Sequence, residues 1–214
     1  MRLRERFEGQ IAGVGSTSGV RLVVGRWARS PFGAFADVMV ERADGHRLLL
    51  APSDRVRELV CGTYVFDETR VEPVTLTDVP GPAGVDGADG PAWRLQSPSL
   101  SLTVAIGERL PLGRLLRLVP RPLATSPEWA TVVDPIARFA VRGVRTRGSA
   151  GQGRREFYGA TDLHAVTWVE GELDGIPLGE LAPVDPPCRF GFSSTPAQPS
   201  VTTVVTTIES ERAS

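Results

Sequence analysis

The chain has 214 residues, an apolar share of 41% and a net charge of -1, so it can build a sizeable core and has no overall charge that favours nucleic acid or acidic membranes. All 24 basic residues are arginine, and the sequence contains neither lysine nor asparagine. The missing lysine excludes a Schiff-base nucleophile, a P-loop lysine and a Ser-Lys dyad, and the missing asparagine excludes N-glycosylation.

The N-terminal part of the chain is predicted to form strands, because short apolar and alternating runs are separated by glycine-rich or polar connections. The predicted strands cover 4–15, 19–27, 33–41 and 46–51. In the third of them Ala36, Val38 and Val40 share one face. The Asp44-Gly45 pair that follows is a strong hairpin signal.

A short helix is predicted after these strands, with Ser53 as its N-cap and Gly62 at its end. Its apolar face carries Val56, Leu59 and Val60. Residues 66–79 are predicted to form the next strand, and Pro73 places that strand toward an edge of the sheet.

The middle of the chain combines a glycine-rich segment with a long strand. Glycine recurs every third residue from Gly81 to Gly90, which is far too short a run for a collagen helix, so we expect a flexible surface loop near 79–92. Residues 93–107 are predicted to form one strand with a buried face and a wetter face. The buried face carries Leu100, Leu102, Val104 and Ile106.

Two helices are predicted next. Over 111–120 Pro111 suits the first turn, and the leucines form an apolar stripe. Over 126–141 Ser126 is the N-cap, and apolar residues recur at helical spacing until Pro135 kinks or ends the helix.

The rest of the chain is predicted to return to β structure, with a long irregular connection over 182–199. The predicted strands cover 141–148, 154–173 and 200–209. About nine short strands with hairpin links indicate a mainly β fold, either an antiparallel barrel or a β-sandwich, with two or three short helices. We expect one domain over 1–208 and a disordered tail over 209–214.

The order of these elements resembles that of lipocalin-like (calycin) β-barrel proteins and their carotenoid-hydratase-like relatives. It also resembles uncharacterised proteins of similar size from high-GC actinobacteria. The likeness lies in the pattern of strands, because the chain lacks a leading G-x-W signature, and it carries over no site residues. It implies a barrel that holds a small lipophilic molecule.

The predicted strand from Arg154 to Glu170 carries the main candidate site. If this strand is continuous, its period of two places a row of ionisable and aromatic side chains on one face. The row consists of Arg154, Glu156, Tyr158, Asp162, His164 and Trp168. Within it Asp162 can orient His164 as a general base, with Tyr158 as a proton donor. The alternative is that the row faces water while the opposite, apolar face packs against the core.

Arginines cluster in the second half of the chain. Residues 109–155 contain ten arginines and two acidic residues, a charge of +8 against -9 for the remainder. Such asymmetry indicates either an anionic partner or packing against the acidic remainder of the same fold. The amphipathic run 109–122 also allows peripheral contact with a membrane surface. No nucleic-acid-binding module is recognised, so nucleic acid is not expected as a partner.

Metal and cofactor sites are not predicted, because His46, His164, Cys61 and Cys188 lack the spacing of a zinc site. One disulfide between the two cysteines and two separate thiols are both open alternatives. The N-terminal segment lacks the apolar run of a secretory signal, and no stretch approaches the roughly 20 apolar residues of a membrane span. We therefore expect a cytoplasmic protein.

The sequence favours a protein that binds a small lipophilic or amphipathic ligand, which can be anionic, in a barrel cavity. The expected ligand contacts are Arg145, Arg147, Arg154, Glu156 and Trp168. A second hypothesis is a cofactor-independent cyclase, hydratase or isomerase of a lipophilic metabolite that uses Asp162, His164 and Tyr158. A third is an interaction protein that docks an acidic partner through the arginine-rich segment.

Overall fold

The computed structural model describes residues 2–126, 147–149, 155–191 and 195–211, and it confirms a mainly β fold. The strands are β1 (Arg2–Ser16), β2 (Arg21–Arg29), β3 (Phe35–Glu41), β4 (Arg47–Ala51), β5 (Glu68–Val71), β6 (Thr75–Pro80), β7 (Pro91–Gln96), β8 (Leu100–Arg109), β9 (Arg147–Ser149), β10 (Arg155–Leu173), β11 (Ile176–Pro177), β12 (Leu181–Ala182) and β13 (Ser200–Glu211). The helices are α1 (Asp54–Cys61), α2 (Pro111–Leu116) and α3 (Arg121–Ala124). The helix predicted over 126–141 lies outside the described residues, apart from Ser126.

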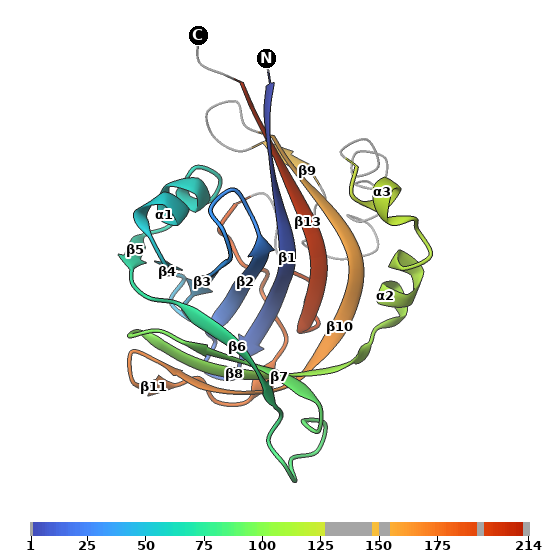
Figure 1. Cartoon of the computed structure of the whole chain (residues 1–214). Coiled ribbons are helices and arrows are strands. Elements are labelled where there is room, and N and C mark those ends of the chain that lie inside the picture. The colour runs from blue at the N-terminus through green and yellow to red at the C-terminus, as the bar shows by residue number, and fades with distance from the viewer. Residues whose placement is uncertain (1, 127–146, 150–154, 192–194, 212–214) are drawn as a thin grey trace.

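These strands form one sheet, whose main path runs β5-β4-β3-β2-β1-β13-β10-β8-β7-β6. Neighbours along the path are antiparallel except β4 and β5, which are parallel. The short strands β9 and β11 pair with β10, and β12 pairs with β1. In Figure 1 the long strands β1, β13 and β10 run side by side toward the end of the molecule where both termini lie.

The sheet is strongly curved but is not closed by strand pairing in the described part of the chain. Its two end strands, β5 and β6, are consecutive in sequence, so the three residues 72–74 join opposite ends of the sheet. Arg26 on β2 forms a bidentate ion pair with Asp78 on β6, with N–O distances of 2.6 and 2.7 Å. The mainly β prediction therefore holds, while the predicted closed barrel is not confirmed.

Two segments predicted as single strands are each divided in the structure. The 66–79 segment forms β5 and β6, with Pro73 between them, because proline has no N–H for the ladder. The 93–107 segment forms the β7–β8 hairpin. Its turn is held by the backbone N–H of Ser97, which donates to Leu100 O at 2.8 Å. Apolar residues occupy odd positions before the second turn (Trp93, Leu95) and even positions after it (Leu100, Leu102), and this change of phase marks the turn in the sequence.

Several local signals in the sequence are confirmed. Ser53 is the N-cap of α1, and its hydroxyl accepts from the backbone N–H of Val56 at 3.4 Å. Gly62 caps the other end of the helix. At the β3–β4 turn Gly45 has φ of +88°, a conformation that glycine adopts without strain. A second such turn at Asp174 joins β10 to β11.

One face of the sheet, here called the core face, carries Ala12, Val24 and Val38 and is packed with aliphatic side chains. Strands β6, β7 and β8 cross over the lower ends of β1 to β4, so this core lies between two parts of the same sheet (Figure 1). Its largest fully buried side chains are Leu22, Leu48, Leu50, Leu95, Leu100, Leu102 and Leu178. Each contributes on the order of 1.5–3 kcal/mol through burial alone.

The opposite face, here called the α1 face, carries Phe7, Trp27 and Asp37. It is covered by α1 and, further along, by the segment around Val184 and Phe190. Strands β2 to β4 are therefore buried on both faces, which explains why their sequences contain continuous apolar runs rather than strict alternation.

A buried ion pair fixes the second covering segment to the sheet. Glu41 on β3 is fully buried and lies 2.9 Å from the guanidinium of Arg21 on β2. The same carboxylate accepts the backbone N–H of Arg189 at 2.6 Å. Arg21 in turn donates to the carbonyl of Pro186 at 3.1 Å. The loop that contains Cys188 and Phe190 is thus held against β2 and β3.

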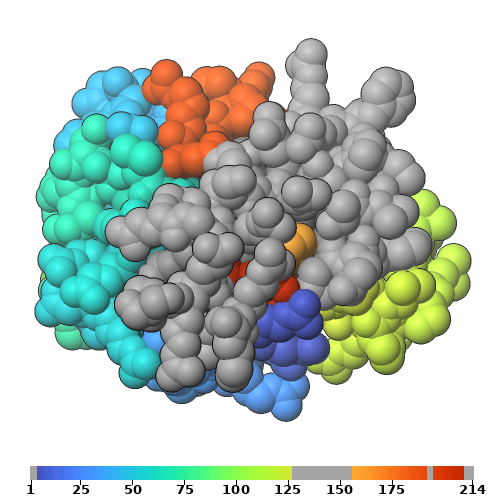
Figure 2. All heavy atoms as spheres, turned by 90° about the horizontal axis from the view of Figure 1, so that it is seen from above, coloured from blue at the N-terminus to red at the C-terminus, as the bar shows by residue number. Residues whose placement is uncertain are grey.

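Helix α1 lies on one side of strands β1 and β13, and helices α2 and α3 lie on the other side (Figure 1). Figure 2, viewed from above, shows the α1 region on one side and the α2–α3 region on the other, with parts of β1 and β13 between them. Gly113 of α2 packs against the Leu163 backbone, and Gly159 of β10 packs against Ala124 of α3. The upper part of β10 is therefore covered by α2 and α3 on its core face, which leaves its other face toward α1.

Candidate functional site

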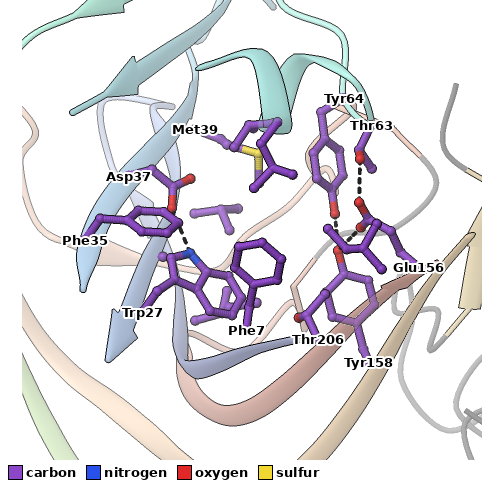
Figure 3. A pocket seen from close by; sticks show the side chains of 16 residues that line it. Phe7, Trp27, Phe35, Asp37, Met39, Thr63, Tyr64, Glu156, Tyr158 and Thr206 are labelled. Atoms are coloured by element: carbon purple, nitrogen blue, oxygen red, sulfur yellow. Dashed lines mark hydrogen bonds between the residues drawn. The ribbon is translucent and has the colours of Figure 1, made fainter. Parts of the chain in front are cut away.

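A pocket of about 70 Å³ lies between the α1 face of the sheet and α1 (Figure 3). Its lining comes from five strands, from α1 and from the two residues after Gly62. The lining residues are Phe7, Ile11, Val23, Gly25, Trp27, Phe35, Asp37, Met39, Leu59, Val60, Thr63, Tyr64, Glu156, Tyr158, Thr206 and Ile208. The lining is mostly apolar and aromatic with a few polar groups, which is typical of small-molecule sites.

The alternation of the strands places these residues. On β2 and β3 the pocket residues follow a strict period of two, so the intervening residues belong to the core face. The apolar face of α1, predicted from Val56, Leu59 and Val60, packs onto the same region. Side chains of α1, β10 and β13 complete the wall of the pocket.

The most unusual group in the pocket is the carboxyl of Asp37, which is only 6% exposed. The indole N–H of Trp27 donates to its Oδ1 at 2.9 Å. Burial raises the pKa of Asp37 to about 7, and the bond from Trp27 offsets only part of this effect. Gly25 lies opposite Asp37 in the β2–β3 register, and a methyl group there would overlap both the carboxyl and the indole. The absence of a side chain at Gly25 makes room for this pair.

A second polar group faces Asp37 across the pocket (Figure 3). The hydroxyl of Tyr158 donates to Glu156 Oε2 at 2.9 Å, and the hydroxyl of Thr63 donates to Glu156 Oε1. The hydroxyls of Tyr64 and Tyr158 lie 2.5 Å apart. Because the single proton of Tyr158 is donated to Glu156, Tyr64 is the donor to Tyr158. These bonds tie the end of α1 to β10.

Both phenols in this group stay protonated at ordinary pH. Burial raises the pKa of Tyr64, and the nearby Glu156 carboxylate adds to the effect. Burial likewise raises the pKa of Tyr158 well above its usual value, again with a contribution from Glu156. Each tyrosine therefore remains a hydrogen-bond donor, and the two form a directed chain that ends at Glu156.

Aromatic rings and one unsatisfied hydroxyl complete the wall. Phe7 packs edge-on against Trp27, with ring centroids 5.9 Å apart, and Trp27 lies 6.3 Å from Phe35. Thr206 on β13 is 4% exposed, and its hydroxyl has no hydrogen-bond partner among the described residues. An unpaired buried hydroxyl costs about 1–3 kcal/mol, so such groups are uncommon in folded proteins.

Two of the residues predicted from the sequence, Glu156 and Tyr158, lie in this pocket. The rest of the predicted row does not share their face. The β10–β13 register shifts between Ala160 and Asp162, which introduces an extra residue and reverses the faces that follow. Asp162 lies instead near α2 and α3, on the side of the sheet where Gly159 packs. The expected single row of ionisable side chains is therefore divided between two faces.

The structure brings Asp162 and His164 near each other but not near Tyr158. The Nε2 atom of His164 lies 3.6 Å from Asp162 Oδ2, and its Nδ1 lies 3.1 Å from Gly107 O. Arg109 donates to Asp162 at 2.8 Å. Burial raises the pKa of Asp162, but the hydrogen bonds from Arg109 and from the Leu163 backbone outweigh it and hold the pKa below its ordinary value. Asp162 is thus mainly an ion-pair partner of Arg109.

The other predicted ligand contacts are elsewhere or outside the described residues. Trp168 is half-buried where β10 pairs with β8, away from the pocket. Arg147 belongs to β9, and its side chain is not described. Arg145 and Arg154 lie outside the described residues. An anionic headgroup held by these arginines stays a prediction.

The basic segment is partly neutralised by the acidic residues of the same fold, since Arg109 pairs with Asp162 and Arg121 with Glu8. Leu115 and Leu118 are 62% and 79% exposed, so the stripe over 111–120 does not pack fully against the core. Membrane contact and docking of an acidic partner through this segment stay predictions.

No helix in the described part of the chain has the length and apolar character needed to cross a bilayer.

Sequence reasoning missed Asp37, Trp27, Tyr64 and Thr206. The signal for Asp37 lay in the strand over 33–41, where Ala36, Val38 and Val40 were assigned to the buried face. The alternate residues include Phe35 and Met39, which are too apolar for a solvated face. A carboxyl between them on a strand with two apolar faces is a candidate for a buried acid. Thr206 and Tyr64 had no such local signal.

Metal ligation has no support within the described residues, which contain no group of three or more His, Cys, Asp or Glu side chains arranged around one point. Cys61 is exposed and Cys188 is buried, and the two do not form a disulfide. Cys188 packs with Val184 and Phe190 as a small apolar side chain.

Comparison of the chain with protein-family models, with curated proteins and with solved structures finds no match.

Proposed function

We propose that this protein binds a small, largely apolar molecule in the pocket between the sheet and α1. The observation that carries the proposal is a pocket lined mostly by aromatic and aliphatic side chains that also contains a buried carboxyl and an unpartnered hydroxyl, Asp37 and Thr206. Asp37 has a single neutral donor, Trp27, and Thr206 has no partner among the described residues, so the burial of both groups is unfavourable. A ligand that bonds to them would offset this cost.

The location differs from that implied by a lipocalin-like barrel, in which the ligand occupies the interior. Here the interior core face is filled by packed aliphatic side chains. The pocket lies on the other face, under α1. The proposed site shares with a lipocalin-like site only its kind of lining, which is an apolar pocket with a few polar groups on a curved sheet.

Native mass spectrometry of the purified protein tests the proposal. We expect a co-purified or added small molecule to appear as a mass increment that is lost in Val60→Phe, because the larger side chain of this α1 residue fills the pocket. The matched control is Val119→Phe, on the opposite side of the sheet in the segment after α2, which should keep the increment. Equal retention in both variants would place the ligand outside this pocket.

Acid–base catalysis in the same pocket is a second candidate function, and Asp37 favours it. A general acid or base works best when its pKa lies near the operating pH, and burial brings Asp37 to about 7. Asp37 would exchange the proton with the substrate, and the Thr206 hydroxyl, which has no partner among the described residues, would be free to donate. Asp37 replaces Asp162 and His164 in this version of the isomerase, hydratase or cyclase hypothesis.

Catalysis and simple binding are separated by the fate of the bound molecule. If the protein is an enzyme, excess ligand incubated with it should change in mass or in chromatographic retention, and Asp37→Asn should not change the ligand even at a concentration that saturates the variant. If the molecule is recovered unaltered from the wild-type protein after long incubation, the catalytic candidate fails while the binding proposal stands.

A further inference from the structure

Apart from the Thr206 hydroxyl, the side-chain proton donors that line the pocket are committed to acceptors within it. The indole N–H of Trp27 is donated to Asp37. The hydroxyl protons of Thr63 and Tyr158 are donated to Glu156, and that of Tyr64 is donated to Tyr158. A ligand in this pocket would meet few donors that are free to bond to it.

Acceptor capacity, by contrast, remains. A carboxylate has about four lone-pair sites, and the described residues give Asp37 one hydrogen bond, from Trp27, so one oxygen remains for a ligand. The Thr206 hydroxyl has no partner among those residues and can accept as well as donate. The free oxygen of Asp37 is therefore a position that a hydrogen-bond donor would fill, and Thr206 can bond to the same donor or to an acceptor.

The charges of the lining point in the same direction. None of the 16 residues that line the pocket in Figure 3 is an arginine or a histidine, whereas two, Asp37 and Glu156, are acids. The rings of Trp27 and Phe35 lie on the same side of the pocket as Asp37, and Phe7 packs against Trp27 (Figure 3). Aromatic faces attract cations, and an ammonium group gains about 2 kcal/mol or more from them when it is desolvated.

We propose that the ligand of this pocket is a small organic amine, whose protonated nitrogen donates to Asp37 while its apolar body packs against the aromatic rings. This inference depends on the proposed binding function and names the class of ligand. The amine provides a donor for the free oxygen of Asp37, and its positive charge offsets the burial of a carboxylate. An alcohol would provide the hydrogen bond without the positive charge. A ligand carboxylate would be repelled by the carboxylates of Asp37 and Glu156.

The pairing makes binding dependent on pH. The ionisable groups that face Asp37 across the pocket are Tyr64, Tyr158 and Glu156, and the lining residues of α1, β1 and β13 are uncharged. Both tyrosines stay protonated, because burial raises the pKa of each. Asp37 has a pKa of about 7, so the carboxylate that an ammonium group prefers is formed as the pH rises through neutrality. Bound amine would in turn favour the ionised form.

Isothermal titration calorimetry with three matched compounds tests the inference. Benzylamine, benzyl alcohol and benzoate share one apolar body and differ in the charge and donor capacity of the head. At pH 8 we expect benzylamine to bind at least tenfold more tightly than benzyl alcohol, and benzoate to be the weakest of the three. The benzylamine affinity should fall severalfold between pH 8 and pH 6, although the amine itself stays protonated.

The variant Asp37→Asn should reduce the benzylamine affinity to that of benzyl alcohol and leave the alcohol affinity within about twofold, which also shows that the pocket is intact. Tighter binding of benzoate than of benzylamine, or an unchanged preference for benzylamine in Asp37→Asn, would overturn the inference and leave the binding function in place. If none of the three compounds binds and no mass increment is found, both proposals fail.

Discussion

Trp27 donates its indole N–H to Oδ1 of Asp37 at 2.9 Å, between neighbouring strands β2 and β3. The two residues are diagonal neighbours in the register, and Gly25 leaves the space in which they meet. One neutral donor is much weaker compensation for a buried carboxylate than an ion pair. The Asp37 pKa of about 7 follows from this geometry, and so do the pH effects expected for the protein.

Asp37→Asn should stabilise the protein at high pH but not at low pH. The pKa of Asp37 is raised from 3.8 to about 7 in the folded state, so the folded protein binds more protons than the unfolded chain between these values, and stability falls as the pH rises through this window. Above pH 7 the buried carboxylate of Asp37 is ionised, which lowers the free energy of unfolding by on the order of 4 kcal/mol. Asparagine keeps the oxygen that accepts from Trp27 and carries no charge.

Urea unfolding of wild type and Asp37→Asn at pH 4 and pH 8 measures this difference. The curves should nearly coincide at pH 4 and separate at pH 8, with the variant more stable. Glu170→Gln, which removes an exposed carboxylate on the same sheet, serves as the control and should show no such divergence. A variant that is equally destabilised at both pH values would show that Asp37 is held as a paired carboxylate instead.

Thr206→Val should stabilise the ligand-free protein and weaken ligand binding. Valine has almost the same shape as threonine and removes a buried hydroxyl that has no partner among the described residues, a gain of about 1–3 kcal/mol. Thr195→Val is the matched control, because that hydroxyl is also buried and unpartnered in the described part of the chain but lies outside the pocket. The midpoint temperature of thermal unfolding should rise in both variants, and benzylamine affinity should fall only in Thr206→Val.

Tyr64 and Tyr158 should be energetically coupled. Tyr158→Phe removes the donor to Glu156 Oε2 and the acceptor for Tyr64, and it should cost about 1–3 kcal/mol. Tyr64→Phe removes one donation and should cost less. A double-mutant cycle measured by chemical unfolding should give a coupling energy of about 0.5–3 kcal/mol. Additive single effects would mean that the two hydroxyls do not interact.

Asp162 and His164 should have no direct role in ligand binding. The register shift before Asp162 places both residues away from the pocket. Asp162→Asn and His164→Ala should therefore leave the affinity for benzylamine within about twofold, whereas Asp37→Asn should reduce it at least tenfold. Loss of binding in His164→Ala with an unchanged unfolding curve would restore the site first predicted from the sequence.

The sequence was most informative where the local chemistry decides the structure. The N-cap Ser53, the stop at Gly62 and the turn at Gly45 were all predictable, because each depends on a residue and its immediate neighbours. The mainly β class followed from alternation in the same way. Closure of the sheet was not predictable, because it depends on how far the pairing extends around a curved path.

The site was only half predictable for a similar reason. Glu156 and Tyr158 were found because they alternate on one strand, but a single extra residue at Thr161 moves Asp162 and His164 to the other face. Periodicity assumes a regular strand, and a bulge leaves no clear mark in one sequence. Asp37 and Thr206 join the site through the packing of α1 and β13, which are distant in sequence.

The indole N–H signal of Trp27, followed by two-dimensional NMR during a titration with benzylamine, tests the central claim most directly. The signal is assigned with Trp27→Phe, and Trp93 is an internal reference because it is buried in the core face, away from the pocket. We expect a saturable shift of the Trp27 signal while the Trp93 signal stays in place. A Trp27 signal that does not move at saturating ligand, or a larger shift at Trp93, would contradict it.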